Sequence, residues 1–133
     1  MKDCIFCKIV SGELKSWKVY EDDNTLAFFD IAQANKYHTL VIPKKHYVDI
    51  YEIPENVLKE VITATKKVAL LYREKLGIDN VQIIQSSGHH AQQDVFHIHF
   101  HIVPRHANDR LNVPWRSNPE TKADFDQMLE RLK

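Results

Sequence analysis

The chain has 133 residues, the length of one ordinary domain, and a hydrophobic content of 44% that is typical of a globular protein with a single core. Lys and Arg together number 18, as do Asp and Glu, so the formal net charge is zero and argues against a broad surface for nucleic acid or an anionic membrane. No stretch approaches the roughly 18 consecutive apolar residues of a membrane span, and the N-terminal residues hold no apolar signal core, so we expect a cytoplasmic protein without nucleic-acid or membrane partners.

The first half of the chain predicts one short helix followed by three strands. Residues Ile5 to Val10 form a short apolar run, which we interpret as one or two helical turns. Two strand-like runs, Trp17–Glu21 and Thr25–Ile31, flank the turn residues Asp22–Asn24 and therefore predict a hairpin. A third strand is predicted over His38–Pro43, where the proline ends it.

The second half predicts a long helix, two further strands and a short C-terminal helix. Pro54–Leu76 carries apolar residues at three- and four-residue steps, and its initial proline suits the first turn of a helix. Val81–Gln85 and Val95–Val103 have the composition of strands, with a polar loop between them. A short helix is predicted over Pro119–Leu132.

The order of these elements is strands, helix and strands again. This order favours an α+β fold with an antiparallel sheet over a parallel doubly wound sheet. We expect a single domain over residues 1–133, with a core over about 3–105 and a C-terminal tail over 106–133.

Three of the eight histidines stand at alternate positions in the last predicted strand. Because successive side chains of a strand point to opposite faces, His97, His99 and His101 share one face. The other face is apolar, and we expect it to pack against the long helix through Phe96, Ile98, Phe100 and Ile102.

Three interpretations of the histidine face are open at this point. An exposed polar face needs no chemistry, although three histidines in register are unusual for one. A single metal ion cannot bind all three, because the outer pair lies about 13 Å apart along a strand and zinc–nitrogen bonds are only about 2.0–2.1 Å long. In the third interpretation the central imidazole attacks an electrophile such as phosphorus, and its neighbours stabilise phosphoryl charge or protonate the leaving group.

The run His97–Val103 resembles the alternating histidine motif of the histidine triad family. The segments Cys4–Val10, Tyr20–Ile31 and His38–His46 resemble the family's N-terminal segment, first hairpin and third strand, in matching order. The resemblance implies a five-stranded antiparallel sheet with helices on one face. It also implies a homodimer with a continuous ten-stranded sheet and two nucleotide sites.

The resemblance assigns chemical roles by position. His99 corresponds to the nucleophile that attacks the α-phosphorus of a nucleotide, forming a nucleotidyl-histidine intermediate that water hydrolyses to a nucleoside monophosphate. His101 and His38 correspond to histidines that face the phosphate. A branch that transfers nucleotidyl groups to sugars has Gln where His101 stands, so the histidine favours hydrolysis. Asp30 corresponds to the acid that binds both ribose hydroxyls.

The resemblance also implies an apolar base pocket for a purine nucleotide such as AMP or GMP. The corresponding positions are Ile5, Phe6, Ile9, Phe28, Phe29 and Ile31. A core role is equally consistent with Ile9 and Phe28. A pocket of this kind makes few specific contacts to the base, so we expect modest purine selectivity.

Four positions near the expected phosphate site bear on the substrate. Ser86 stands where relatives often have an Asn that bonds near the phosphate or ribose. Gln93 keeps a glutamine that relatives share, whereas Gln92 replaces a glycine whose backbone approaches phosphate closely. Asp94 replaces a hydroxyl donor with a group that only accepts when ionised, so we expect an altered leaving-group contact and substrate preference.

The sequence also contains one Cys-x-x-Cys pair, Cys4 and Cys7. A redox role would require a thioredoxin-like strand and helix, which the sequence lacks, and a structural zinc ion would need two further ligands. Some bacterial relatives with this pair use histidines that correspond to His46 and His97, so the resemblance implies structural Zn²⁺, with paired buried thiols as the alternative. We expect no cofactor for the chemistry itself, and His89, His90 and His106 have no corresponding role.

Three functions follow from the resemblance. The first is a hydrolase for purine nucleoside phosphoramidates. The second is a dinucleoside polyphosphate hydrolase, because the segment Val103–Arg105 after the triad resembles that branch of the family. The third is a nucleotide-binding regulatory protein with little turnover.

Overall fold

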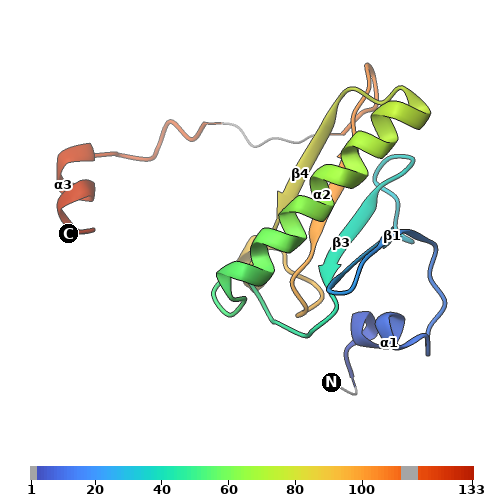
Figure 1. The fold of residues 1–133 in the computed structure, drawn as a ribbon. Coiled ribbons are helices and arrows are strands. Elements are labelled where there is room, and N and C mark those ends of the chain that lie inside the picture. Colours follow the sequence, from blue (N-terminus) through green and yellow to red (C-terminus); the bar gives the residue numbers. More distant parts are fainter. Residues whose placement is uncertain (1–2, 112–116) are drawn as a thin grey trace.

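The computed structural model describes residues 3–111 and 117–133 and contains one antiparallel sheet with three helices (Figure 1). In chain order the elements are α1 (Ile5–Ser11), β1 (Lys18–Glu21), β2 (Thr25–Phe29), β3 (Thr39–Pro43), α2 (Glu55–Leu76), β4 (Val81–Gln85), a 3₁₀ turn (His89–Ala91), β5 (Phe100–Pro104) and α3 (Phe125–Glu130). The strands are ordered β1-β2-β3-β5-β4. The predicted α+β fold with five antiparallel strands, one long helix and a short C-terminal helix is confirmed.

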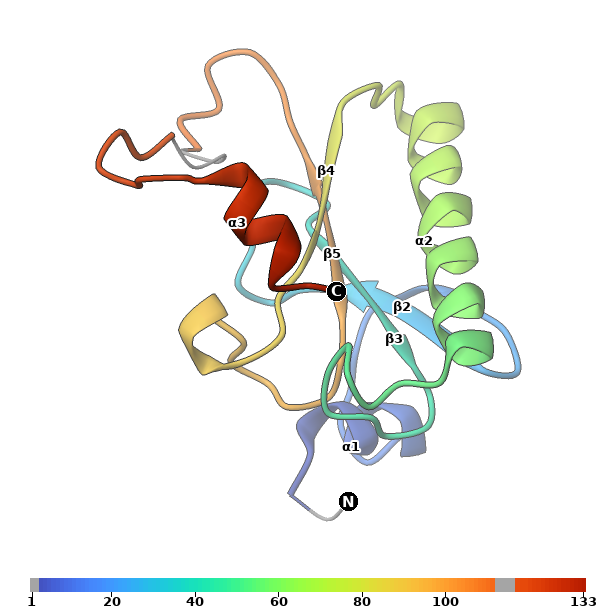
Figure 2. The same cartoon turned by 90° about the vertical axis from the view of Figure 1, so that its left-hand side faces the viewer.

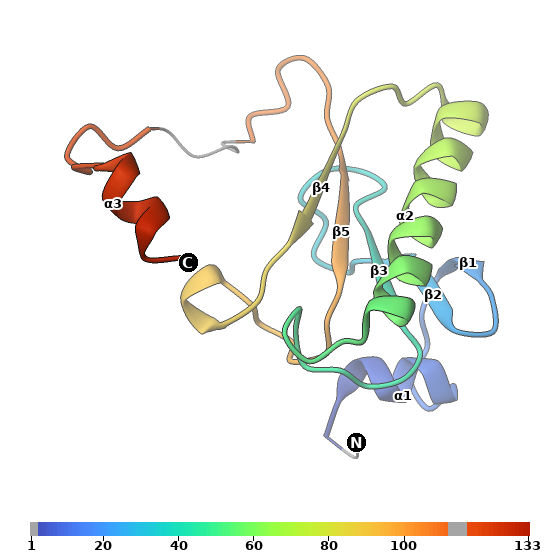
Figure 3. The ribbon, with the colours of Figure 1, turned by 60° about the vertical axis from the view of Figure 1, so that its left-hand side comes forward.

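The two faces of the sheet are covered differently, as Figures 2 and 3 show from the side. Helix α2 packs on one face, where Val61 and Val68 meet Val41 and Ile102 in the larger core cluster. Leu40 and Ile42, the neighbours of Val41 in β3, point to the opposite face of the sheet. On that face they form a second core cluster with Leu26, Phe28 and Phe6 of α1. The helices therefore lie on both faces, in contrast to the one-sided arrangement that the resemblance implied.

Helix α2 has the ends that its sequence predicts. Pro54 is the N-cap residue in extended conformation, and the helix begins at Glu55. Gly77 adopts the left-handed conformation with φ 67°, and its N–H donates to the carbonyls of Tyr72 and Arg73. Glycine adopts this conformation without steric cost, so it ends the helix after Leu76.

Strand β5 is shorter than predicted, because it begins at Phe100 and not at Val95. Its ladder with β3 ends at the pair Val41 and Phe100, and the same register would place Ile98 opposite Pro43, which lacks an N–H. The preceding segment bonds elsewhere: the N–H of Ile98 donates to the carbonyl of Tyr47 at 2.7 Å. Ile98, Phe100 and Ile102 pack toward α2 as expected, whereas Phe96 lies before the strand with 48% of its surface exposed.

The remaining differences concern element ends. Trp17, Ile31 and His38 lie just outside the strands in which they were predicted, and the polar loop before β5 includes the 3₁₀ turn. Helix α3 covers only part of the predicted Pro119–Leu132, and it begins after Asp124, whose carboxylate accepts from the N–H of Gln127. Every residue of 117–133 is exposed, and α3 stands apart from the sheet in Figures 1 and 3. Within the described ranges, no helix combines the length and apolar character needed to cross a bilayer.

Candidate active site and metal cluster

A cavity of about 520 Å³ opens beside α1 and the end of β2. Its wall includes all six positions predicted for the base pocket: Ile5, Phe6, Ile9, Phe28, Phe29 and Ile31. Its polar lining includes Asp30, Asp94, His99 and His101. The fold therefore brings together one apolar wall and several groups capable of acid–base or nucleophilic chemistry.

His99 is buried in this wall and held in one orientation. Its Nδ1 lies 2.8 Å from the backbone carbonyl of His97, and the edge of the Phe6 ring packs against it at a centroid distance of 5.1 Å. A carbonyl oxygen only accepts, so Nδ1 carries the proton and donates it. The opposite nitrogen, Nε2, then keeps its lone pair, the form required of a nucleophile or base.

His38 and His101 form a hydrogen-bonded pair beside His99. The N–H of Ala34 donates to Nδ1 of His38 at 3.1 Å, and Nε2 of His38 lies 2.9 Å from Nδ1 of His101. Since Nδ1 of His38 accepts, its Nε2 carries the proton and donates to His101. His101 then carries its own proton on Nε2, where it is available to a group in the cavity.

Burial disfavours the charged form of this histidine pair. Desolvation lowers the pKa of His101 to about 4, with further lowering by the nearby His99 and His38. Burial also lowers the pKa of His38, although the carboxylate of Asp30 opposes this effect from 3.5 Å away. The donors of Asp30, His38 and His101 lie within 4.8 Å of one another and could also hold a metal ion, but the two histidines already bond to each other.

Asp30 follows the last residue of β2 and lines the cavity between Phe29 and Ile31. One carboxylate oxygen accepts from the N–H of Ala32 at 2.8 Å, which fixes the local turn. The second oxygen faces His38. Asp30 thus lies at the junction of the apolar wall and the histidines.

The three predicted residues before β5 occupy different environments. Asp94 lines the cavity, with Oδ1 3.7 Å from Nε2 of His99 and 82% of its side chain exposed. Gln93 is buried, and its amide donates to the carbonyls of Val48 and Val95 and accepts from the N–H of Gly88. Ser86 is half-buried, and neither it nor Gln93 is among the residues that line the cavity.

The cavity wall also contains residues that the sequence did not suggest. Leu14, Lys15, Ser16 and Trp17 follow α1 and close one side of the cavity. The chain reaches this position because Gly12, with φ 84°, ends α1 in the left-handed conformation. The sequence feature that could have indicated this wall is Gly12, a helix-ending residue shortly before a tryptophan. Trp17 lines the cavity and retains 51% exposure.

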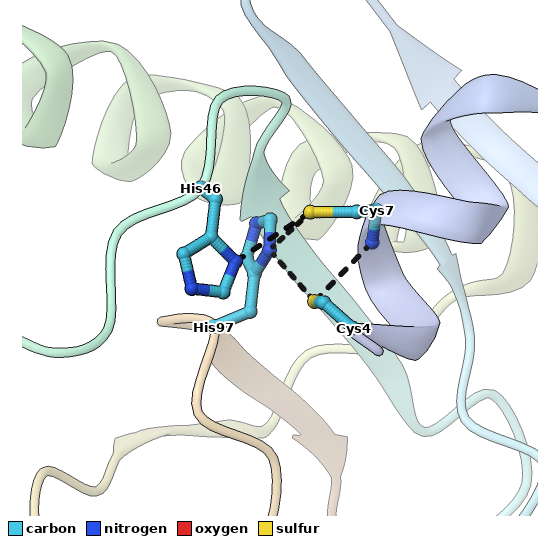
Figure 4. Close-up of side chains that lie close together, drawn as sticks. All are labelled: Cys4, Cys7, His46 and His97. Carbon is cyan, nitrogen blue, oxygen red and sulfur yellow. Dashed lines mark hydrogen bonds between the residues drawn. The ribbon is translucent and has the colours of Figure 1, made fainter. Parts of the chain in front are cut away.

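A second cluster, the metal cluster, consists of Cys4, Cys7, His46 and His97 (Figure 4). Nδ1 of His97 lies 3.4 Å from Sγ of Cys4 and 3.6 Å from Sγ of Cys7, and Nδ1 of His46 lies 3.5 Å from Sγ of Cys7. All four donor atoms lie within 4.8 Å of one another. With bonds of about 2.3 Å to sulfur and 2.0–2.1 Å to nitrogen, a tetrahedral zinc ion separates such donors by about 3.6 Å.

The protonation pattern of His97 also suits a metal ligand. Its Nε2 donates to the carbonyl of Pro43 at 2.8 Å, so Nδ1 directs a lone pair toward the two sulfur atoms. His97 is fully buried, and burial lowers its pKa to about 4. Both cysteines are free thiols, and burial raises the pKa of Cys7. The four residues therefore form a group that could hold a metal ion.

Comparison with known proteins identifies the family. A model of the HIT domain matches residues 11–108, well over half of the chain. The chain belongs to the HIT family. The resemblance to histidine triad proteins is thereby confirmed, and the match extends from the last residue of α1 to the turn after β5.

Other HIT proteins align with nearly all of this chain. It is 43% identical to an uncharacterised HIT-like protein of Methanocaldococcus jannaschii, over 98% of each chain. It is 37% identical to the adenosine 5'-monophosphoramidase hnt1 of Schizosaccharomyces pombe, again over 98% of each chain. The crystal structure of a zinc-bound histidine triad family protein from Mycobacterium smegmatis has a TM-score of 0.79 and 39% identity, and the match covers 90% of this chain and 85% of that one.

Proposed function

We propose that this HIT protein hydrolyses purine nucleoside phosphoramidates, such as adenosine monophosphoramidate, through a nucleotidyl-histidine intermediate on His99. The observation that carries the proposal is the hydrogen bond from Nδ1 of His99 to the carbonyl of His97. It leaves a buried imidazole with its free nitrogen beside a cavity of suitable size for a nucleoside. The monophosphoramidase name of the S. pombe relative supports the same reaction.

The reaction proceeds in two steps. Nε2 of His99 attacks the α-phosphorus, a P–N bond to His99 forms, and the P–N bond to the leaving group breaks. The departing nitrogen keeps the electron pair and takes the proton from Nε2 of His101. Water then attacks the phosphorus, which releases the nucleoside monophosphate, returns the electron pair to His99 and returns a proton to His101.

The surrounding residues bind the nucleotide. The apolar wall holds the base, and the carboxylate of Asp30 accepts from the ribose hydroxyls. His38 holds His101 in the tautomer that donates toward the phosphate. Gln93 positions the loop before β5 through its three backbone bonds, and Ser86 has a hydroxyl that can donate a hydrogen bond near the phosphate.

We also propose that the metal cluster binds one structural Zn²⁺ through Cys4, Cys7, His46 and His97. The donor spacings and the Nδ1 lone pair of His97 support this assignment, as does the zinc-bound relative. The ion would cross-link α1 to the segments before α2 and before β5. It takes no part in the chemistry, for which the chain needs no cofactor.

A substrate panel tests the proposed function. The wild-type protein should release AMP from adenosine monophosphoramidate at a much higher kcat/KM than from diadenosine tri- or tetraphosphate. His99→Ala should abolish turnover while nucleotide affinity, measured by calorimetry, changes little. Faster cleavage of the dinucleotides would favour the rival polyphosphate hydrolase, and tight binding without turnover would favour a regulatory protein. Retained activity in His99→Ala would exclude the mechanism.

A further inference from the structure

A second cavity, of about 480 Å³, lies next to the nucleotide cavity. The two share Ile5, Asp94 and Val95 in their linings, so they adjoin at the mouth of the site. Apart from Cys4 and His46 of the metal cluster, the second cavity is lined by apolar Val48 and Phe96 and by the carboxylate of Asp3. None of its described lining residues is Lys or Arg.

Asp94 stands at the boundary between the two cavities. Its Oδ1 accepts from the N–H of Val95 at 2.9 Å and lies 3.7 Å from Nε2 of His99. With most of its side chain exposed, it can follow a group that passes from the nucleotide cavity into the second one. The approach to His99 therefore carries a negative charge at the boundary between the two cavities.

We infer that the second cavity receives the leaving group, and that Asp94 favours leaving amines whose chain carries a cationic group over leaving groups that carry negative charge. The inference rests on the proposed function. When the P–N bond breaks, the leaving nitrogen keeps the electron pair, takes the proton from Nε2 of His101 and gains a second proton from water to become an ammonium ion. Before this bond breaks, the carboxylates of Asp94 and Asp3 attract a cationic group on the chain of the leaving amine, whereas a polyphosphate leaving group meets two like charges.

The substrate class that follows is the nucleoside 5'-phosphoramidate of an alkyl diamine, in which the second amine is a free ammonium group. The apolar surface from Val48, Val95 and Phe96 contacts the methylene chain, and the carboxylates contact the ammonium group. Asp94 is thus the residue that separates phosphoramidates from dinucleoside polyphosphates in this site.

Two substrates of equal length test the inference without changing the bond that breaks. In both substrates AMP is joined through a P–N bond to a four-carbon chain. The chain ends in an ammonium group in the 1,4-diaminobutane derivative and in a carboxylate in the 4-aminobutanoate derivative. For the wild type we expect a kcat/KM ratio of roughly tenfold or more in favour of the ammonium substrate. A charge about 4 Å from a carboxylate contributes about 1 kcal/mol, which is attractive for one substrate and repulsive for the other, and a factor of ten corresponds to about 1.4 kcal/mol. Asp94→Asn and Asp94→Ser should lower the ratio several-fold, and the preference that remains is due to Asp3.

Asp23→Asn is the matched control, because it removes the same charge from the exposed turn between β1 and β2. It should leave the ratio at the wild-type value. A ratio unchanged in Asp94→Asn overturns the inference, as does an equal loss of activity toward both substrates, which would mean that Asp94 acts on His99 alone. Wild-type protein that releases no AMP from either substrate overturns the proposed function as well, so the two failures are distinguishable.

Discussion

At the scale of single residues, the site depends on which imidazole nitrogen carries a proton. One hydrogen bond fixes the tautomer of each histidine in the site. His99 donates to a backbone carbonyl, and His38 accepts from a backbone N–H. His101 in turn accepts from His38. The lone pair on His99 and the proton on His101 are therefore in place before a substrate arrives. This arrangement gives His38 a role that does not require contact with the substrate.

His38→Ala should lower kcat by about 10- to 100-fold, because His101 loses the donor that keeps its proton on Nε2. KM should change less, since the apolar wall and Asp30 are retained. His38→Gln, whose amide can still donate to His101, should recover part of the activity. Steady-state kinetics of both variants check this, and equal losses in the two would contradict a positioning role for His38.

The sequence predicted which histidines form the site, but it did not predict how their side chains are hydrogen-bonded. Alternation placed His97, His99 and His101 on one face, and the family resemblance separated their roles. The bond from His99 to the carbonyl of His97 was not foreseen, because it depends on the chain leaving regular strand geometry before Phe100. The use of Gln93 by the scaffold was also hidden, since a buried amide and a ligand-binding amide look alike in sequence.

At the scale of elements, α1 supports two sites at once. It supplies Phe6 and Ile9 to the nucleotide cavity and the ligand Cys7 to the metal cluster, with Cys4 as its N-cap. An isolated helix of seven residues is not stable in water, so its position must come from tertiary contacts. The metal cluster provides such contacts to the segments before α2 and before β5.

Cys4→Ser tests the structural zinc ion at this scale. Serine retains an N-cap acceptor for α1 but is a poor zinc ligand, so the variant isolates the loss of metal from the loss of the cap. We expect close to one zinc per wild-type chain and little in the variant. The melting temperature should fall by roughly 10 °C, the effect of about 2–3 kcal/mol in a domain of this size.

Wild-type protein stripped with a chelator is the control and should melt near the variant. Wild-type protein that contains no stoichiometric zinc, although prepared without chelators, would exclude the structural ion and leave two buried thiols.

Element positions were predictable where local chemistry is strong. Pro54 and Gly77 bracket α2 within one residue of its prediction, and Asp22–Asn24 correctly marks the first hairpin. The start of β5 was misplaced because an uninterrupted alternation suggests a strand, whereas the ladder with β3 ends at Phe100 and the N–H of Ile98 bonds to Tyr47 instead. Such pairing information is not local to the segment it affects.

At the scale of the whole molecule, β1 and β4 are the edge strands of the sheet. Within residues 3–111 and 117–133, β4 pairs with β5 alone, and Ile83 on it retains 42% exposure. Unpaired N–H and C=O groups on an edge strand favour pairing with another strand. We propose that two copies join through this edge, in the ten-stranded homodimer that the family resemblance implies.

Light scattering should therefore give twice the monomer mass of 15.6 kDa. Ile83→Lys should shift the protein toward monomer, because it places a charge on the joining edge. Tyr51→Lys, which replaces an exposed side chain in the turn before α2, should leave the dimer intact. A wild-type protein that is monomeric at micromolar concentration would contradict the proposal.

The side chain and the backbone of His97 have separate roles, which affects how mutations at this position are interpreted. Its side chain belongs to the metal cluster, while its backbone carbonyl orients His99. A saturation mutational scan would mark all three triad histidines as intolerant, but for unrelated reasons: His99 for its nitrogen, His101 for its proton and His97 for the shape of the chain around it. Every amino acid carries a carbonyl, so no codon change at position 97 removes the group through which that residue serves catalysis.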